Sequence, residues 1–169
     1  MASKKRQPQD SLDLLPGIGP AFQKRLSRLD LSTIRELLHH YPARYLDYRI
    51  HSKIRDLKPK KDVSFIATIG EPKRFVSRSG KLIIQAEAAD KTGKIKLTWF
   101  NTPYISRVII PGQTYLIAGK TSFWADKITL VAPIIEREGG TSIHTQGLVP
   151  IYPLTSKVTS RFLRQKILL

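Results

Sequence analysis

The sequence predicts an α+β protein that is mainly β, in which a five-stranded barrel follows a small helical segment. Apolar residues between positions 14 and 42 recur at helical spacing, whereas those after position 62 alternate with polar or smaller residues, as in half-buried strands. Glycines and prolines divide the second pattern into short strands. With 169 residues and 41% hydrophobic content, the chain can bury the core of one ordinary domain or two small ones.

The helical part is predicted over residues 11–59. Its first helix follows the run Leu15-Pro16-Gly17-Ile18-Gly19-Pro20 and carries an i, i+4, i+7 apolar stripe that begins at Phe22. A second helix begins after Thr33, which has capping-box spacing to Glu36, and stops at the next proline. The run Gly17-Ile18-Gly19, between helical segments, resembles the hairpin of a helix-hairpin-helix motif.

The barrel is predicted over residues 60–136. Its five strands are expected at residues 63–69, 82–89, 95–99, 114–122 and 127–135. Between the second and third, Asp90-Lys91-Thr92-Gly93 is a turn in which we expect Gly93 to supply a positive φ. A short helix at 103–110, with Tyr104, Val108 and also Ile105 as candidates for its inward face, separates the third strand from the fourth. This order is that of the OB-fold, a partly open barrel that leaves one face and two loops for a ligand.

Both ends of the chain are predicted to lie outside these two parts. Residues 1–10 are polar and basic, which indicates a disordered arm. Residues 137–169 are predicted to be a linker and the start of a helix at Ser160. Because no capping residue ends that helix, we expect the chain to be part of a longer protein.

The charge balance identifies the class of partner. The chain has 29 Lys and Arg against 13 Asp and Glu, a net charge of +16, which attracts polyanions before any contact forms. Nucleic acid is the expected partner. A membrane is not, because no apolar run reaches the ~18 residues of a spanning helix. Without a secretory signal or any cysteine, we expect a cytoplasmic, nucleoid-associated monomer.

The glycine turn of the helical part is a candidate phosphate site. Gly17 and Gly19 would let the backbone approach a phosphate, and Lys24 and Arg25 would lie one turn away. Two interpretations stay open, because glycines at a turn can also serve its geometry alone.

A basic hairpin between the first two barrel strands is the second candidate. Residues 72–84 contain no acid, and we expect the cations of this segment to hold phosphates. They are Lys73, Arg74, Arg78 and Lys81. The alternative is a solvated loop.

Two aromatic residues follow the third barrel strand. Trp99 alternates with core positions, so Phe100 points to the other side, and Tyr104 comes four residues later. Exposed at the rim, Phe100 and Tyr104 could stack on bases or wedge between strands. Alternatively, both rings plug the barrel end.

No residues support catalysis by this chain. Gly119-Lys120-Thr121 is not a nucleotide-binding loop, because Thr114 stands where that motif requires a glycine. The histidines show no metal-ligand spacing with carboxylates. We therefore expect no catalytic residues, no metal and no cofactor in these residues.

The ordered set of motifs resembles the N-terminal region, including the wedge domain, of bacterial RecG-type helicases. The motifs include Leu15-Pro16-Gly17-Ile18-Gly19-Pro20, Glu36-Leu37-Leu38-His39-His40-Tyr41-Pro42, Asp90-Lys91-Thr92-Gly93, Trp99-Phe100-Asn101 and Val149-Pro150-Ile151-Tyr152-Pro153. The resemblance implies an OB-fold wedge that holds a DNA branch point. It also implies motor domains elsewhere that use ATP and Mg²⁺, and base stacking by Phe100 and Tyr104.

The function predicted from these features is a branched-DNA-binding wedge that grips forks or Holliday junctions and splits strands for fork reversal and recombinational repair. A free-standing OB-fold module for single-stranded nucleic acid is the alternative. A barrel that docks an acidic protein is a third interpretation.

Overall fold

The computed structural model describes residues 6–49, 51–124, 127–139 and 143–168. The chain divides into two compact units, one formed by Met1–Leu46 with Pro150–Leu169 and the other by Asp47–Val149. The second unit contains the barrel and is wider at both ends than the predicted range of 60–136. The two passages of the chain between the units form a two-stranded sheet of β1 (Arg44–Tyr48) and β9 (Gly147–Ile151).

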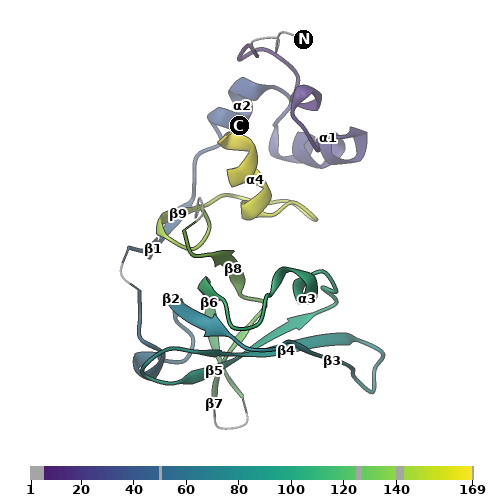
Figure 1. The fold of residues 1–169 in the computed structure, drawn as a ribbon. Helices are drawn as coiled ribbons and strands as arrows, with labels where there is room; N and C mark the ends of the chain where they lie inside the picture. The colour runs from purple at the N-terminus through teal and green to yellow at the C-terminus, as the bar shows by residue number, and fades with distance from the viewer. Residues whose placement is uncertain (1–5, 50, 125–126, 140–142, 169) are drawn as a thin grey trace. The chain divides into compact units, whose positions relative to one another are not determined.

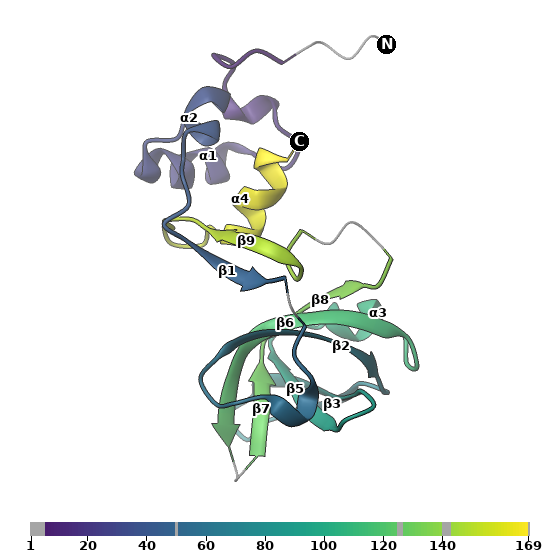
Figure 2. The ribbon, with the colours of Figure 1, turned by 90° about the vertical axis from the view of Figure 1, so that its left-hand side faces the viewer.

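The first unit is helical, and its core is built from part of the predicted stripes. The second helix ends at Leu38 rather than at Pro42, and Leu38 and Tyr41 of its predicted stripe are exposed. The elements of this unit are η1 (Leu12–Leu14), α1 (Pro20–Leu26), η2 (Ser27–Leu29), α2 (Ile34–Leu38) and α4 (Ser160–Ile167). Leu26, Leu37 and Leu163 are fully buried in one apolar cluster, so α4 packs with α1 and α2 (Figure 2). The capping box is confirmed: Thr33 accepts from the Glu36 N–H, and the Glu36 carboxylate accepts from the Thr33 N–H.

Part of the predicted N-terminal arm packs on this unit. The Pro8 and Asp10 carbonyls accept hydrogen bonds from the N–H groups of Arg35 and Ile34, at 2.7 and 2.9 Å. These bonds satisfy donors at the start of α2 that have no partner inside the helix. Residues 1–5 of the predicted arm lie outside the described residues.

The second unit is a closed five-stranded barrel with OB-fold connectivity (Figure 1). Its strands are β2 (Asp62–Ile69), β4 (Leu82–Ala89), β5 (Lys94–Phe100), β6 (Thr114–Trp124) and β7 (Lys127–Val131). They are hydrogen-bonded in the order β2-β4-β5-β7-β6, and β6 pairs back with β2 to close the barrel. The pairs are antiparallel except β5 with β7, which is parallel. The predicted OB-fold is therefore confirmed.

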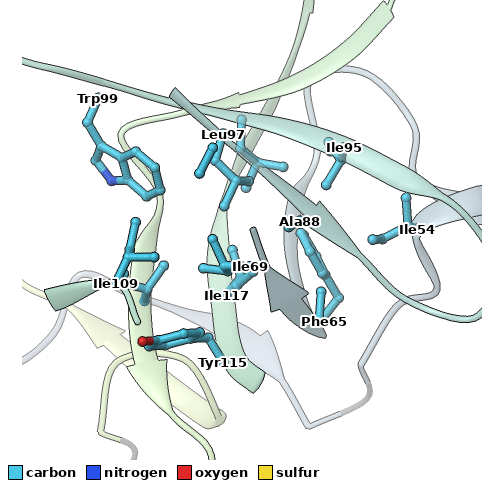
Figure 3. Packing of buried hydrophobic residues seen from close by; sticks show 14 of the residues in the cluster. Ile54, Phe65, Ile69, Ala88, Ile95, Leu97, Trp99, Ile109, Tyr115 and Ile117 are labelled. Carbon is cyan, nitrogen blue, oxygen red and sulfur yellow. The ribbon is translucent and has the colours of Figure 1, made fainter. Parts of the chain in front are cut away.

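Alternate residues of β5 fill the barrel (Figure 3). Ile95, Leu97 and Trp99 are buried, as their alternation predicted. The Trp99 Nε1–H donates to the Pro133 carbonyl at 2.9 Å, which satisfies the only polar atom of the indole side chain. The buried Tyr115 hydroxyl donates to the Val108 carbonyl at 3.1 Å and accepts from the Ile110 N–H at 2.8 Å. Tyr115 thereby holds the end of α3 (Ile105–Val108) against the barrel.

The predicted fifth strand is two strands. β7 ends at Val131, and β8 (Ile134–Arg137) begins after Pro133 and pairs with β6. Ala132 has a φ of 48°, and Pro133 has no N–H to donate, so the ladder breaks there. Gly119 lies close to the break: a Cβ at this position would lie 3.1 Å from the Leu130 Cδ2 and 3.4 Å from the Pro133 Cα.

The turn between β4 and β5 differs from its prediction in one respect. Gly93 does not have a positive φ; a Cβ there would instead lie 3.4 Å from the Ile54 side chain in η3 (Ile54–Asp56). Asp90 holds this close approach, because its carboxylate accepts from the N–H groups of Ile54, Thr92 and Gly93 and from the Thr92 hydroxyl. Desolvation raises the pKa of Asp90, but these hydrogen bonds outweigh it, so that the pKa lies below its ordinary value.

Residues just after β8, predicted as linker, belong to the barrel unit. His144 and Thr145 are buried, and the Glu136 carboxylate accepts from the His144 N–H at 3.2 Å and from the Thr145 hydroxyl at 2.5 Å. The Ser64 hydroxyl on β2 donates to the Thr145 carbonyl at 2.6 Å. Residues 140–142 of the predicted linker lie outside the described residues.

Candidate nucleic-acid interface

The basic segment after β2 is a two-stranded arm rather than a loop. β3 (Lys73–Val76) pairs with the first half of β4, while the second half of β4 pairs with β2. In Figure 1 the β3–β4 arm extends sideways from the barrel. Its tip turns through Gly80, which has a φ of 75°, and the Ser77 N–H donates to the Lys81 carbonyl at 2.9 Å. The sequence did not predict this strand, because its residues are basic or exposed and do not alternate between apolar and polar.

The register of the arm separates its cations between two faces of the sheet. Lys73 lies opposite Gln85, which is on the outer side of β4, whereas Arg74 lies opposite the fully buried Ile84 and so belongs to the inner side. All four residues of β3 are nonetheless exposed. Arg78 and Lys81 lie at the exposed tip.

The outer face of the arm carries an apolar row. Phe75 lies opposite Ile83, and Ile83 lies opposite Phe100. Directly opposite residues project from the same face of a sheet, so the row crosses β3, β4 and β5. In the next row, Lys73, Gln85 and Thr98 follow one another, and the Gln85 amide donates to the Thr98 hydroxyl at 3.3 Å.

Asn101 sets the positions of the two candidate stacking rings. It has a φ of 52°, a conformation that asparagine tolerates better than most residues. Its N–H donates to the Leu82 carbonyl at 2.8 Å and its Oδ1 accepts from the Leu82 N–H at 3.2 Å. These two bonds end β5 just after Phe100 and turn the chain toward Tyr104.

Both rings are exposed: 44% of Phe100 and 55% of Tyr104 is accessible to solvent. The plug interpretation requires enclosed rings and does not match these values. The predicted inward face of the short helix is wrong for Tyr104 and Val108, which are exposed. Ile105, also predicted to face inward, is buried, and so is Ile109. Tyr104 precedes the first turn of α3, so the buried positions are Ile105 and Ile109, one residue after Tyr104 and Val108.

The glycine turn belongs to the first unit. Gly17 has a φ of 78°, and the Gly19 carbonyl accepts from the N–H groups of Phe22 and Gln23, which starts α1. Lys24 is exposed, while the Arg25 guanidinium lies 5.2 Å from the centroid of the Phe22 ring. Sequence reasoning missed a further cation here: the Lys166 ammonium from α4 donates to the Pro16 carbonyl. No local pattern predicts that contact, since 150 residues separate the partners.

The far end of the outer face has an ion pair. The Lys94 ammonium lies 2.8 Å from the Glu87 carboxylate. The hydrogen bond to Glu87 and the negative charge of Glu87 raise the pKa of Lys94. Among the described residues, no three acidic or histidine side chains are grouped closely enough to hold a metal ion. None of the helices in the described part of the chain has the length and apolar composition of a membrane span.

Comparison with known proteins agrees with this architecture. The RecG wedge domain model matches residues 12–168. ATP-dependent DNA helicase RecG of Thermotoga maritima is 28% identical over 156 residues, which are 88% of this chain and 19% of the relative. The Bacillus subtilis helicase of the same name is 28% identical over 167 residues, 96% of this chain and 23% of the relative. The chain thus spans about a fifth of the length of these relatives.

A solved structure also matches the fold over nearly the whole chain. RecG bound to a three-way DNA junction aligns with a TM-score of 0.82, covering 98% of this chain and 23% of that chain, at 23% identity. The closed barrel with its projecting arm defines an OB-fold protein. The chain belongs to the RecG wedge domain family.

Proposed function

We propose that this chain binds branched DNA as the wedge region of a RecG-like helicase. In this proposal it grips replication forks or Holliday junctions and splits strands at the branch point during fork reversal and recombinational repair. The observation that carries the proposal is the exposure of Phe100 and Tyr104 on either side of the Asn101 turn, next to an acid-free basic arm. Membership in the wedge family and the junction-bound relative support it.

The division of labour follows from the chemistry of the residues. Lys73, Arg78 and Lys81 hold phosphates from the outer face and the tip of the arm, and Arg74 adds a weaker phosphate contact from the inner side. These contacts give affinity without sequence preference. Phe100 and Tyr104 stack on the bases that lose their partners where two strands part. In the helical unit, the Gly17 and Gly19 turn with Lys24 and Arg25 is a second phosphate contact. ATP and Mg²⁺ act in the motor of a longer parent protein, since the relatives are ATP-dependent helicases.

The test compares a Phe100→Ala, Tyr104→Ala double variant with the unchanged chain on forked and linear DNA of equal length. Each lost stacking contact is expected to weaken fork binding by about 1–3 kcal/mol. Linear duplex offers no unpaired base, so its affinity is expected to stay the same. Equal losses on both substrates, or no loss on the fork, would contradict the wedge.

A matched control is Phe123→Ala. Phe123 is exposed on β6, but it lies opposite Ile128, which packs against the core, so it belongs to the inner side of the sheet. Its removal is expected to leave the preference for forks unchanged.

The alternative, a module for single strands, uses the same outer face of β4 and β5. It predicts that a plain single strand binds as tightly as a fork of equal unpaired length. A clear preference for the fork excludes this alternative.

A further inference from the structure

We propose that Phe75 is an additional base-stacking residue and that the row Phe75–Ile83–Phe100 is a platform for an unpaired nucleic-acid strand. This inference rests on the proposed function and extends it from the rim of the barrel onto the β3–β4 arm. No sequence motif singled out Phe75, because the role follows from cross-strand register alone.

The first step is geometric. Phe75 and Phe100 both lie opposite Ile83, one on each side of it, so all three side chains project from one face of the sheet. Neighbouring strands lie ~4.8 Å apart, which places the two ring-bearing positions about 10 Å from each other across the sheet. A chain of nucleotides crossing the strands could lay one base over each ring and another over Ile83.

The second step concerns burial. Phe75 is 43% exposed and is not a member of the barrel core cluster. A large apolar side chain kept at the surface of a short, all-exposed strand adds little to folding, and exposed apolar patches with polar rims commonly mark binding surfaces. The exposure of Phe75 matches that of Phe100 in the same row, at 44%.

The third step is charge, which selects the occupant. Lys73 precedes the ring on β3 and projects from the same face, and Lys81 lies at the exposed tip of the arm. No acid occurs between residues 72 and 84. Apolar rings beside cations suit a ligand with flat apolar faces and a negatively charged backbone, which is an unpaired nucleic-acid strand. An acidic peptide would satisfy the cations but would not need the rings.

The test uses the full chain with Phe75→Ala, Phe75→Leu and Phe75→Tyr. Binding is measured to a fork with one unpaired arm and to a three-way junction with every arm paired. Loss of one stacked base is expected to weaken binding of the unpaired-arm fork by about 5- to 150-fold for Ala and Leu, and Tyr should bind like the original chain. The paired junction should be unaffected. The salt dependence should also stay the same, because no charge is removed.

Several outcomes would overturn the inference. If Leu binds as well as Phe, the position needs only an apolar side chain. If Phe75→Ala instead changes the oligomeric state of the DNA-free protein in sedimentation, the row is a contact between copies. If Phe100→Ala weakens fork binding and Phe75→Ala does not, the platform fails while the wedge stands. If neither Phe100→Ala nor Phe75→Ala weakens fork binding, the proposed function itself fails. Thermal unfolding of each variant checks that the fold is retained, and Phe123→Ala is the exposed-ring control.

Discussion

The closed barrel and the β3–β4 arm share one strand, β4, but the strand that pairs with β4 is buried in the barrel and exposed in the arm. Where β4 pairs with β2, Ala88 is fully buried and the opposite residue, Ile69, is too. Where β4 pairs with β3, every residue of the partner strand is exposed. Closure supplies a second layer of side chains for the barrel strands, including Ile84 in the half of β4 that pairs with β3, whereas β3 itself has none. The comparison indicates that stability resides in the barrel and recognition in the arm.

The largest expected effect comes from breaking the barrel at Trp99, the neighbour of Phe100 on β5. Trp99→Ala leaves a cavity and leaves the Pro133 carbonyl without its donor, so the free energy of unfolding should fall by about 3–5 kcal/mol. Phe100→Ala, on the other side of the same strand, should cost much less stability. Denaturant unfolding of both variants measures the difference. Similar losses would show that the two faces do not divide stability from recognition.

A smaller effect is expected when one cation is removed from either face of the arm and the two variants are compared. Lys73→Gln removes a cation from the face of the aromatic row, so the slope of log K against log salt should decrease by about 0.9 for fork DNA. Arg74→Gln should change the slope less, because Arg74 projects from the inner side. Binding titrations at several salt concentrations report both slopes. Equal changes would indicate that DNA contacts both faces of the arm.

The smallest effect concerns acid stability of the Asp90 turn. The folded-state pKa of Asp90 lies below the ordinary value of 3.8, so its ionised form stabilises the fold above that pH. The contribution is lost as pH falls below 3.8 through the folded-state pKa. Asp90→Asn should therefore make the free energy of unfolding less dependent on pH in that acid range. Above that range, the slope of the free energy of unfolding against pH should be the same in both proteins. Denaturant unfolding at a series of pH values measures this; equal acid slopes in both proteins would contradict the role of the carboxylate.

Local signals predicted most elements of the fold. The stripe that begins at Phe22, the Thr33 capping box and the alternation through Trp99 depend on residues a few positions apart, and the structure has each of them. The second helical stripe is present only as far as Leu37, because Leu38 and Tyr41 are exposed. Strand β3 was missed because its residues are exposed on both faces and so leave no alternating pattern. The break between β7 and β8 was missed although Pro133 lies inside the range predicted as one strand, where a proline is itself a signal that the ladder is interrupted.

The candidate site shows the same division. The sequence identified Phe100, Tyr104 and the cations of the arm by residue type and spacing. It could not show that Lys73 and Arg74 lie on opposite faces, or that Phe75 shares a row with Phe100. The first fact requires that residues 73–76 form a strand, in which neighbours point to opposite faces, and the second depends on the register between β3, β4 and β5.

The sequence by itself determined the period of each segment, the excess of positive charge and the absence of a phosphate-binding loop at Gly119-Lys120-Thr121. These properties reside in neighbouring residues or in composition. Only the tertiary structure decided which side chains share a face. A slip of one residue in strand pairing moves every side chain to the other side of a sheet. Closure of the whole barrel selects the register, and no single strand carries that information.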